Sequence, residues 1–132
     1  MKMPHYLLDV NVLIAHAILE HEHHRIVSDD LRQLANQGSC FHVCLIVELG
    51  LIRNAMSIGS LQIDDAKQLL ENEITNLDLK HIADDIGASA LRDWVQGCRQ
   101  TTDAYLSTLA EARGLTLLTI DKGIPGTERL IA

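Results

Sequence analysis

The order of apolar and polar residues changes abruptly near the start of the chain. An apolar run from Tyr6 to Leu8 stops at Asp9, and from Val10 onward apolar residues recur every three or four positions. The run is typical of a buried strand and the later spacing of an amphipathic helix, so the chain passes from strand to helix at Asp9. In a parallel α/β sheet, a carboxylate at that place lies at the carboxyl end of a strand, where such sheets bind ligands. Asn11 is close enough to cap the helix or to support Asp9.

The stretch LTLLTID, near the other end, is a second apolar run that ends in a carboxylate, here Asp121. Thr119 lies two residues earlier, so on a strand the two side chains point the same way. Just upstream, QTTDAYLSTLAEARG predicts a helix that is capped by Thr101 or Thr102 and carries Asp103 in its first turn. The helix dipole and the free N–H groups favour the ionised form of Asp103. Acidic residues are common at helix starts for the same reason, so a purely structural role stays open.

Strands and helices alternate along the rest of the chain. The sequence predicts a helix after HEHH, a short strand near 40–43, a helix to about 55, a helix within 57–76, a strand over 76–82, a helical stretch over 84–94 and a last short strand in RLIA. Such alternation predicts βαβ units and a mainly parallel sheet. The expected fold is α/β, a three-layer sandwich with a central sheet of four to five strands flanked by helices.

Glu48 lies on the helix predicted to follow residue 43. Its neighbours at three and four positions are all apolar: Cys44, Leu45, Leu51 and Ile52. Burying an unpaired carboxylate on such a face costs on the order of several kcal/mol, so Glu48 needs a cation, a hydrogen-bonded partner or a proton. A salt bridge to Arg53 would satisfy it without any functional role.

The composition narrows the class of protein. The length of 132 residues predicts one domain, and no apolar run reaches the roughly 18 residues of a membrane span, so we expect a cytoplasmic protein without a membrane. A net charge of −7 argues against coating nucleic acid by phosphate neutralisation, although it suits a site that gathers carboxylates around a cation. The three cysteines lack zinc-like spacing and are expected to be reduced core residues. The sequence does not decide whether His21, His23 and His24 have a role, although the cluster is typical of a solvated helix start.

The four carboxylates suggest a common chemistry. Asp9, Glu48, Asp103 and Asp121 lie at a strand end, at a helix start or on an apolar helix face. If they converge, they repel one another unless cations bind, and an all-oxygen acidic site suits Mg²⁺ or Mn²⁺ rather than zinc. Mg²⁺ favours phosphate oxygens and lowers the pKa of its bound water, which can then attack a phosphodiester.

Read in order, LLDVNVLIA, VELGLIR and QTTDAYLSTLAEARGLTLLTIDKG resemble the PIN-domain family, and within it the VapC-type toxins. The resemblance covers essentially the whole chain, which implies a single nuclease domain over residues 1–132. It places the family's carboxylates and supporting polar groups at Asp9, Glu48, Asp103, Asp121, Asn11 and Thr119. It also implies a Mg²⁺-dependent endoribonuclease, a small VapB-like antitoxin as partner, and a homodimer. Val10 departs from the family, because many members carry a Thr hydroxyl there.

Two other classes of function remain. One is a housekeeping PIN nuclease that processes RNA without an antitoxin, and the other is a non-catalytic regulatory α/β domain of the receiver type with acidic residues around Mg²⁺. The receiver type needs a Lys at the end of a late strand, where this chain has Asp121. A binding-only PIN fold is disfavoured because all four carboxylates are present. With only 3% aromatic residues, base stacking is a poor recognition mode, and the candidate phosphate contacts are basic residues: Arg53, Arg92, Arg99 and Lys122.

Overall fold

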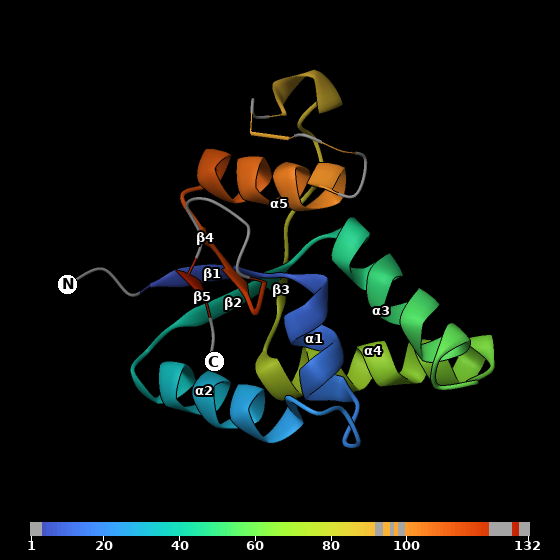
Figure 1. The fold of residues 1–132 in the computed structure, drawn as a ribbon. Helices are drawn as coiled ribbons and strands as arrows, with labels where there is room; N and C mark the ends of the chain where they lie inside the picture. Colours follow the sequence, from blue (N-terminus) through green and yellow to red (C-terminus); the bar gives the residue numbers. More distant parts are fainter. Residues whose placement is uncertain (1–3, 92–93, 96, 98–99, 122–127, 130–132) are drawn as a thin grey trace.

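The structure, a computed structural model, describes residues 4–91, 94–95, 97, 100–121 and 128–129. Five strands form one sheet in its centre: β1 (His5–Leu8), β2 (Cys40–Val43), β3 (Lys80–His81), β4 (Thr116–Thr119) and β5 (Glu128–Arg129). Their order across the sheet is β3-β2-β1-β4-β5, and every neighbouring pair is parallel (Figure 1). The predicted parallel sheet is therefore confirmed.

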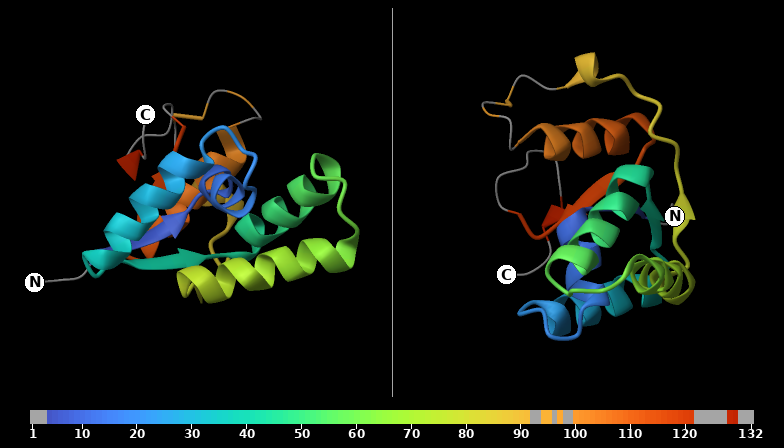
Figure 2. Two further views of the ribbon diagram at one scale, coloured as in Figure 1. Left: turned by 90° about the horizontal axis from the view of Figure 1, so that it is seen from below. Right: turned by 90° about the vertical axis from the view of Figure 1, so that its right-hand side faces the viewer.

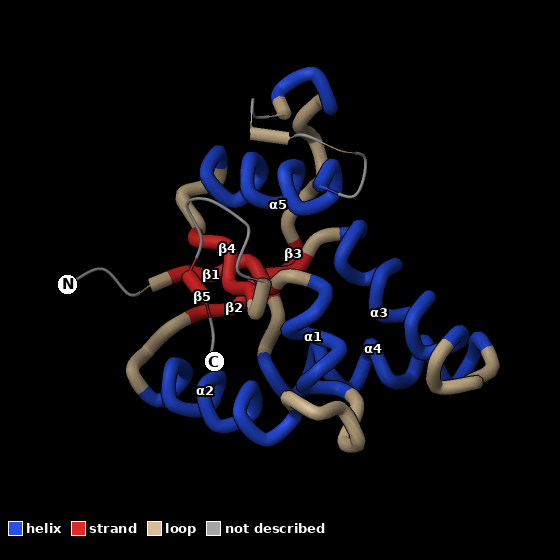
Figure 3. The backbone as a smooth tube through the Cα atoms, in the orientation of Figure 1, coloured by secondary structure: helices blue, strands red, loops and turns tan. Residues whose placement is uncertain are grey.

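Helices cover both faces of the sheet. They are α1 (Val10–Ala17), α2 (His24–Asn36), α3 (Leu45–Ser57), α4 (Ile63–Leu77), α5 (Thr101–Ala112) and the short 3₁₀ helix η1 (Ala88–Ala90). Helix α5 lies on one face, and α1 and α2 lie on the other (Figure 3). Helices α3 and α4 pack against each other and against α1 (Figure 2). These three layers agree with the sandwich expected from the sequence.

Strands β1 and β4 bring an early and a late segment of the chain together. Leu8 of β1 pairs with Leu118 of β4, and both side chains are fully buried. Because both faces of a parallel sheet are covered, such central strands are continuous apolar runs rather than alternating ones. The backbone N–H of Asp9 donates to the carbonyl of Leu118 at 2.9 Å, so the pairing continues to the first residue after β1. The residues that directly follow β1 and β4 therefore lie at the same edge of the sheet.

Several predicted boundaries were wrong between residues 57 and 91, and residues 92–93 of the helical stretch predicted over 84–94 lie outside the described residues. Helix α3 runs on to Ser57, so α4 begins only at Ile63 and continues through Leu77, where Asp78 ends it in a left-handed conformation (φ 49°). The strand predicted over 76–82 is therefore only the two residues of β3. The helix predicted from residue 84 is absent over 84–87, and only η1 is helical before residue 91. Asp84 instead accepts hydrogen bonds from the N–H groups of Leu45 and Ile46 at the start of α3.

Smaller details also differ from the sequence-based expectation. Gln100, rather than Thr101 or Thr102, occupies the N-cap of α5. The last strand overlaps RLIA at Arg129 alone, and residues 130–132 lie outside the described residues. Cys40 and Cys44 are free thiols, and burial raises the pKa of Cys44 to about 12, whereas Cys98 is not described. Across the described ranges, no helix is long and apolar enough to cross a membrane.

Candidate active site

Asp9 is held rigidly at the junction of β1 and α1. It is the N-cap of α1, and its Oδ1 accepts a hydrogen bond from the N–H of Val10 at 2.7 Å. Its other oxygen, Oδ2, accepts from the hydroxyl of Thr119 at 2.8 Å. Asp9 is only 4% exposed, and burial raises its pKa while these two hydrogen bonds lower it. Both carboxylate oxygens are thus oriented before anything binds.

Thr119 links three parts of this site. Its hydroxyl donates to Asp9 and accepts from the side-chain amide of Asn11 at 3.2 Å and from the N–H of Asp121 at 3.0 Å. One hydroxyl offers one donor and two acceptor positions, so Thr119 uses its full capacity. The carbonyl oxygen of Asn11 lies 3.4 Å from the N–H of Ile120. Asn11 therefore ties the start of α1 to the end of β4, rather than capping α1.

Asp103 joins the same group from the first turn of α5. Burial, followed by the charges of Asp9 and Asp121, raises the pKa of Asp103 to about 6. The charge of Asp121 likewise raises the pKa of Asp9. The helix start by itself favours the ionised form of Asp103, but burial and two neighbouring carboxylates outweigh that effect. The structure thus brings three of the four sequence-selected carboxylates within electrostatic reach of one another.

Glu48 pairs with a residue outside this group of three. It lies in the first turn of α3, where its Oε1 is 3.2 Å from Nε2 of His81 on β3. It is not among the charges that raise the pKa of Asp9 or Asp103. Its partner is therefore His81 and not Arg53, which is exposed on α3. Sequence reasoning missed His81, because the pair depends on β3 lying beside β2.

The basic residues selected for substrate binding are mostly outside the described part of the chain. Arg92, Arg99 and Lys122 belong to the undescribed positions. A hollow of about 430 Å³ lies elsewhere, with Ser39 and Cys40 at the beginning of β2 among its lining residues. Because Asp9 follows the opposite, carboxyl end of the strands, this hollow is not part of the carboxylate site.

The donor set fits a loosely held divalent cation rather than a closed metal centre. Over the residues that the structure describes, no three His, Cys, Asp or Glu side chains are arranged to hold a metal ion together. Structural zinc needs four such ligands, so neither the carboxylates nor the histidines at the start of α2 form a zinc site. Mg²⁺ needs only one or two direct carboxylate ligands and keeps several waters, so one or two of Asp9, Asp103 and Asp121 are enough to hold it.

This fold and site define an α/β protein with an acidic site at the carboxyl edge of a parallel sheet. The family model described as "PIN domain" matches residues 6–130, and the chain belongs to that family. It is 34% identical over 125 residues to Ribonuclease VapC38 of Mycobacterium tuberculosis, a match that covers 89% of this chain and 86% of that protein. It is also 30% identical over 119 residues to Ribonuclease VapC29 of the same organism, with the same coverage.

A solved structure shows a similar fold. In the crystal structure of VapBC2 from Rickettsia felis bound to a DNA fragment from their promoter, one chain superposes with a TM-score of 0.68 and 19% identity. The match covers 95% of this chain and 96% of that one. The resemblance to the PIN-domain family, and within it to VapC-type proteins, is confirmed.

Proposed function

We propose that the chain is a metal-dependent endoribonuclease that hydrolyses phosphodiester bonds of RNA as the toxin of a toxin–antitoxin pair. The observation that supports this function best is the placement of Asp9, Asp103 and Asp121: Thr119 binds both the Asp9 carboxylate and the N–H of Asp121, and the charges of both aspartates raise the pKa of Asp103. Relatives named Ribonuclease VapC38 and VapC29 support the choice of RNA. In this proposal residues 1–132 act as one nuclease domain in the cytoplasm.

Nucleases of the PIN family generally use a divalent metal, and we propose Mg²⁺ for this chain, with Mn²⁺ as a substitute. Asp9, Asp103 and Asp121 would hold the ion, directly or through its bound waters, with Glu48 as the fourth carboxylate. A bound ion would supply a water molecule of lowered pKa and would steady the charge of the leaving oxygen. Thr119 fixes the orientation of Asp9 for this purpose. Asp103, with its pKa raised to about 6, would bind a cation more weakly at low pH, because its carboxylate must be ionised to act as a ligand.

An exposed apolar face supports the expected protein partners. Leu45, Leu49 and Met56 are 52%, 48% and 42% exposed and, at spacings of four and seven, share one face of α3. Exposed apolar patches commonly mark protein interfaces. We propose that this face pairs with a second copy in a homodimer, and that a small VapB-like antitoxin inhibits the enzyme. Sedimentation of the wild type and Leu49→Glu tests the first part, because only the wild type should be dimeric.

Cleavage of cellular RNA tests the proposed function. The purified wild type should cleave RNA in Mg²⁺ and not in chelator, whereas Asp9→Asn should be inactive. Asn also serves as an N-cap, so this variant should keep α1 folded. Asp64→Asn is the matched control, since Asp64 is an exposed aspartate in the first turn of α4 and should not matter for cleavage. Equal cleavage with and without metal, or by Asp9→Asn, would contradict the proposal.

The toxin role needs its own experiment. Expression of the wild type in a bacterial host should stop growth, and co-expression of an antitoxin-like reading frame beside the gene should restore it. A housekeeping nuclease would cleave RNA in the first assay, yet it would neither stop growth nor respond to the neighbouring product.

A further inference from the structure

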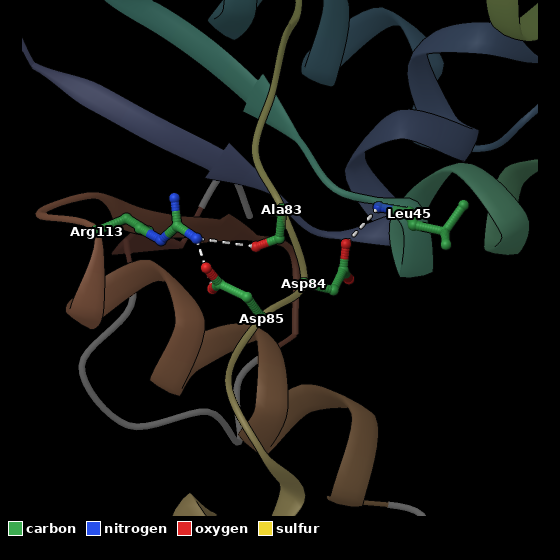
Figure 4. Close-up of polar contacts among 5 residues, drawn as sticks. All are labelled: Leu45, Ala83, Asp84, Asp85 and Arg113. Atoms are coloured by element: carbon green, nitrogen blue, oxygen red, sulfur yellow. Dashed lines mark hydrogen bonds and ion pairs between the residues drawn. The ribbon is translucent and has the colours of Figure 1, made fainter.

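Residues 81–84, called the 81–84 segment, run from the end of β3. This segment contacts the first turn of α3 at several points. His81 Nε2 lies 3.2 Å from Oε1 of Glu48. Asp84 accepts hydrogen bonds from the N–H of Leu45 at 2.9 Å and of Ile46 at 3.3 Å, one on each carboxylate oxygen. Figure 4 shows Asp84 reaching Leu45 at the start of this helix.

The Asp84 contacts supply a cap that α3 lacks locally. Its N-cap residue, Cys44, makes no side-chain capping hydrogen bond. The first N–H groups of any helix have no partner within the helix, and a carboxylate there also interacts favourably with the helix dipole. Asp84 provides both the hydrogen-bond acceptors and the negative charge, although it lies 39 residues after Leu45 in the chain. It therefore fixes the backbone of the turn that carries Glu48.

His81 contacts the side chain of Glu48, whereas Asp84 contacts the backbone of this turn. A glutamate has three rotatable bonds, so a fixed backbone alone does not place its carboxylate. The helix neighbours of Glu48 at three and four positions are apolar and offer no hydrogen bond. Only 17% of the Glu48 side chain is exposed, against 54% for His81, so the pair lies at the border between the helix face and solvent.

We propose that His81 and Asp84 are positioning residues that together set where the Glu48 carboxylate stands relative to Asp9, Asp103 and Asp121. This inference rests on the proposed function, in which Glu48 is one of the four carboxylates. Partners that orient a metal-binding side chain affect metal affinity by roughly 10- to 100-fold when they are removed. Misplacement of a catalytic group by about 1 Å has effects of similar size on rate.

The test compares variants of adjacent residues. Asp84→Ala removes the cap. If this variant does not fold, Asp84→Asn is used in its place, because asparagine keeps one acceptor oxygen. His81→Ala removes the Glu48 partner, while His81→Gln keeps an N–H donor. Asp85→Asn is the matched control, because Asp85 pairs with Arg113 rather than with the start of α3 (Figure 4).

Two measurements are made on each folded variant: Mn²⁺ affinity by calorimetry without RNA, and kcat and KM for a short RNA in Mg²⁺. We expect His81→Ala and Asp84→Ala to weaken Mn²⁺ binding and lower kcat by roughly 10-fold with little change in KM. His81→Gln should recover most of the loss, and Asp85→Asn should behave as wild type.

Unchanged Mn²⁺ affinity and kcat in His81→Ala, while Glu48→Gln loses both, would overturn the positioning role and leave the proposed function intact. An equal loss in Asp84→Asn and Asp85→Asn would also overturn it, because the effect would then not depend on α3. A wild-type protein that shows no metal-dependent cleavage would instead contradict the proposed function.

Discussion

Replacing Asp103 by asparagine should stabilise the metal-free protein near neutral pH. The pKa of Asp103 is raised from 3.8 to about 6, so the folded protein binds this proton more tightly than the unfolded chain does. The contribution to stability is fully present below the unfolded pKa, near 4, and is lost as the pH rises through about 6. Above pH 6 the folded state therefore holds a charge that is unfavourable there. An asparagine side chain at this position has the same shape without that charge.

The magnitude follows from the size of the shift. A pKa unit corresponds to about 1.4 kcal/mol, so a rise from 3.8 to about 6 gives an upper bound of about 3 kcal/mol. Asp103 remains partly open to water, and solvent screening reduces this bound to on the order of 1 kcal/mol. For a chain of 132 residues, that free energy raises the melting temperature by roughly 3 to 4 °C.

Thermal unfolding in chelator between pH 4 and pH 8 measures the effect. The Asp103→Asn variant should melt above wild type at pH 7.5, and the difference should shrink toward zero at pH 4. Added Mg²⁺ should raise the wild-type melting temperature more than that of the variant, because it binds the folded site and not the unfolded chain. Asp64→Asn controls for the loss of one exposed carboxylate. A variant that melts below wild type at pH 7.5 in chelator would refute the idea that three carboxylates repel one another here.

Further variants test the rest of the site. Thr119→Val should lower the free energy of unfolding by roughly 1 to 3 kcal/mol, because it leaves a buried oxygen of Asp9 without its donor. Denaturant titration measures this loss, and Thr119→Ser, which keeps the hydroxyl, should be close to wild type. Gly50→Ala places a Cβ 2.8 Å from the Val10 side chain and should lower the free energy of unfolding by about 1 to 3 kcal/mol. In a double-mutant cycle, adding Val10→Ala should restore most of this stability. Additive losses would mean that the two residues do not touch.

Local sequence patterns were sufficient to predict the three aspartates of this site and the elements that carry them. The change of period at Asp9, the apolar run before Asp121 and the position of Asp103 in a helix start are all visible within a few residues of sequence. Parallel sheets order their strand ends at one edge, so the meeting of these three carboxylates follows from strand prediction together with the fold class. The structure confirms the strand and helix elements on which that argument depends, apart from the boundaries between 57 and 91.

Long-range contacts explain what sequence reasoning did not find. Asp84 and Asp85 look like the start of a helix, yet one caps α3 and the other pairs with Arg113 on the far side of the segment. His81 becomes the partner of Glu48 only because β3 pairs with β2. The pKa of Asp103 likewise reflects charges more than 90 residues earlier and 18 residues later, which no local rule includes.

The pairing of β1 with β4 has a consequence for synthesis. Asp9 leaves the ribosome well before Thr119, whose hydroxyl orients it from 110 residues later in the chain. Contacts of such sequence separation form late in folding, because the long intervening loop must close first. A nascent chain that already contains Asp9 thus lacks the other half of the acidic edge until about 110 further residues have been added. The enzyme that we propose would remain harmless to the messenger RNA and ribosome that produce it until Thr119 and Asp121 have been made.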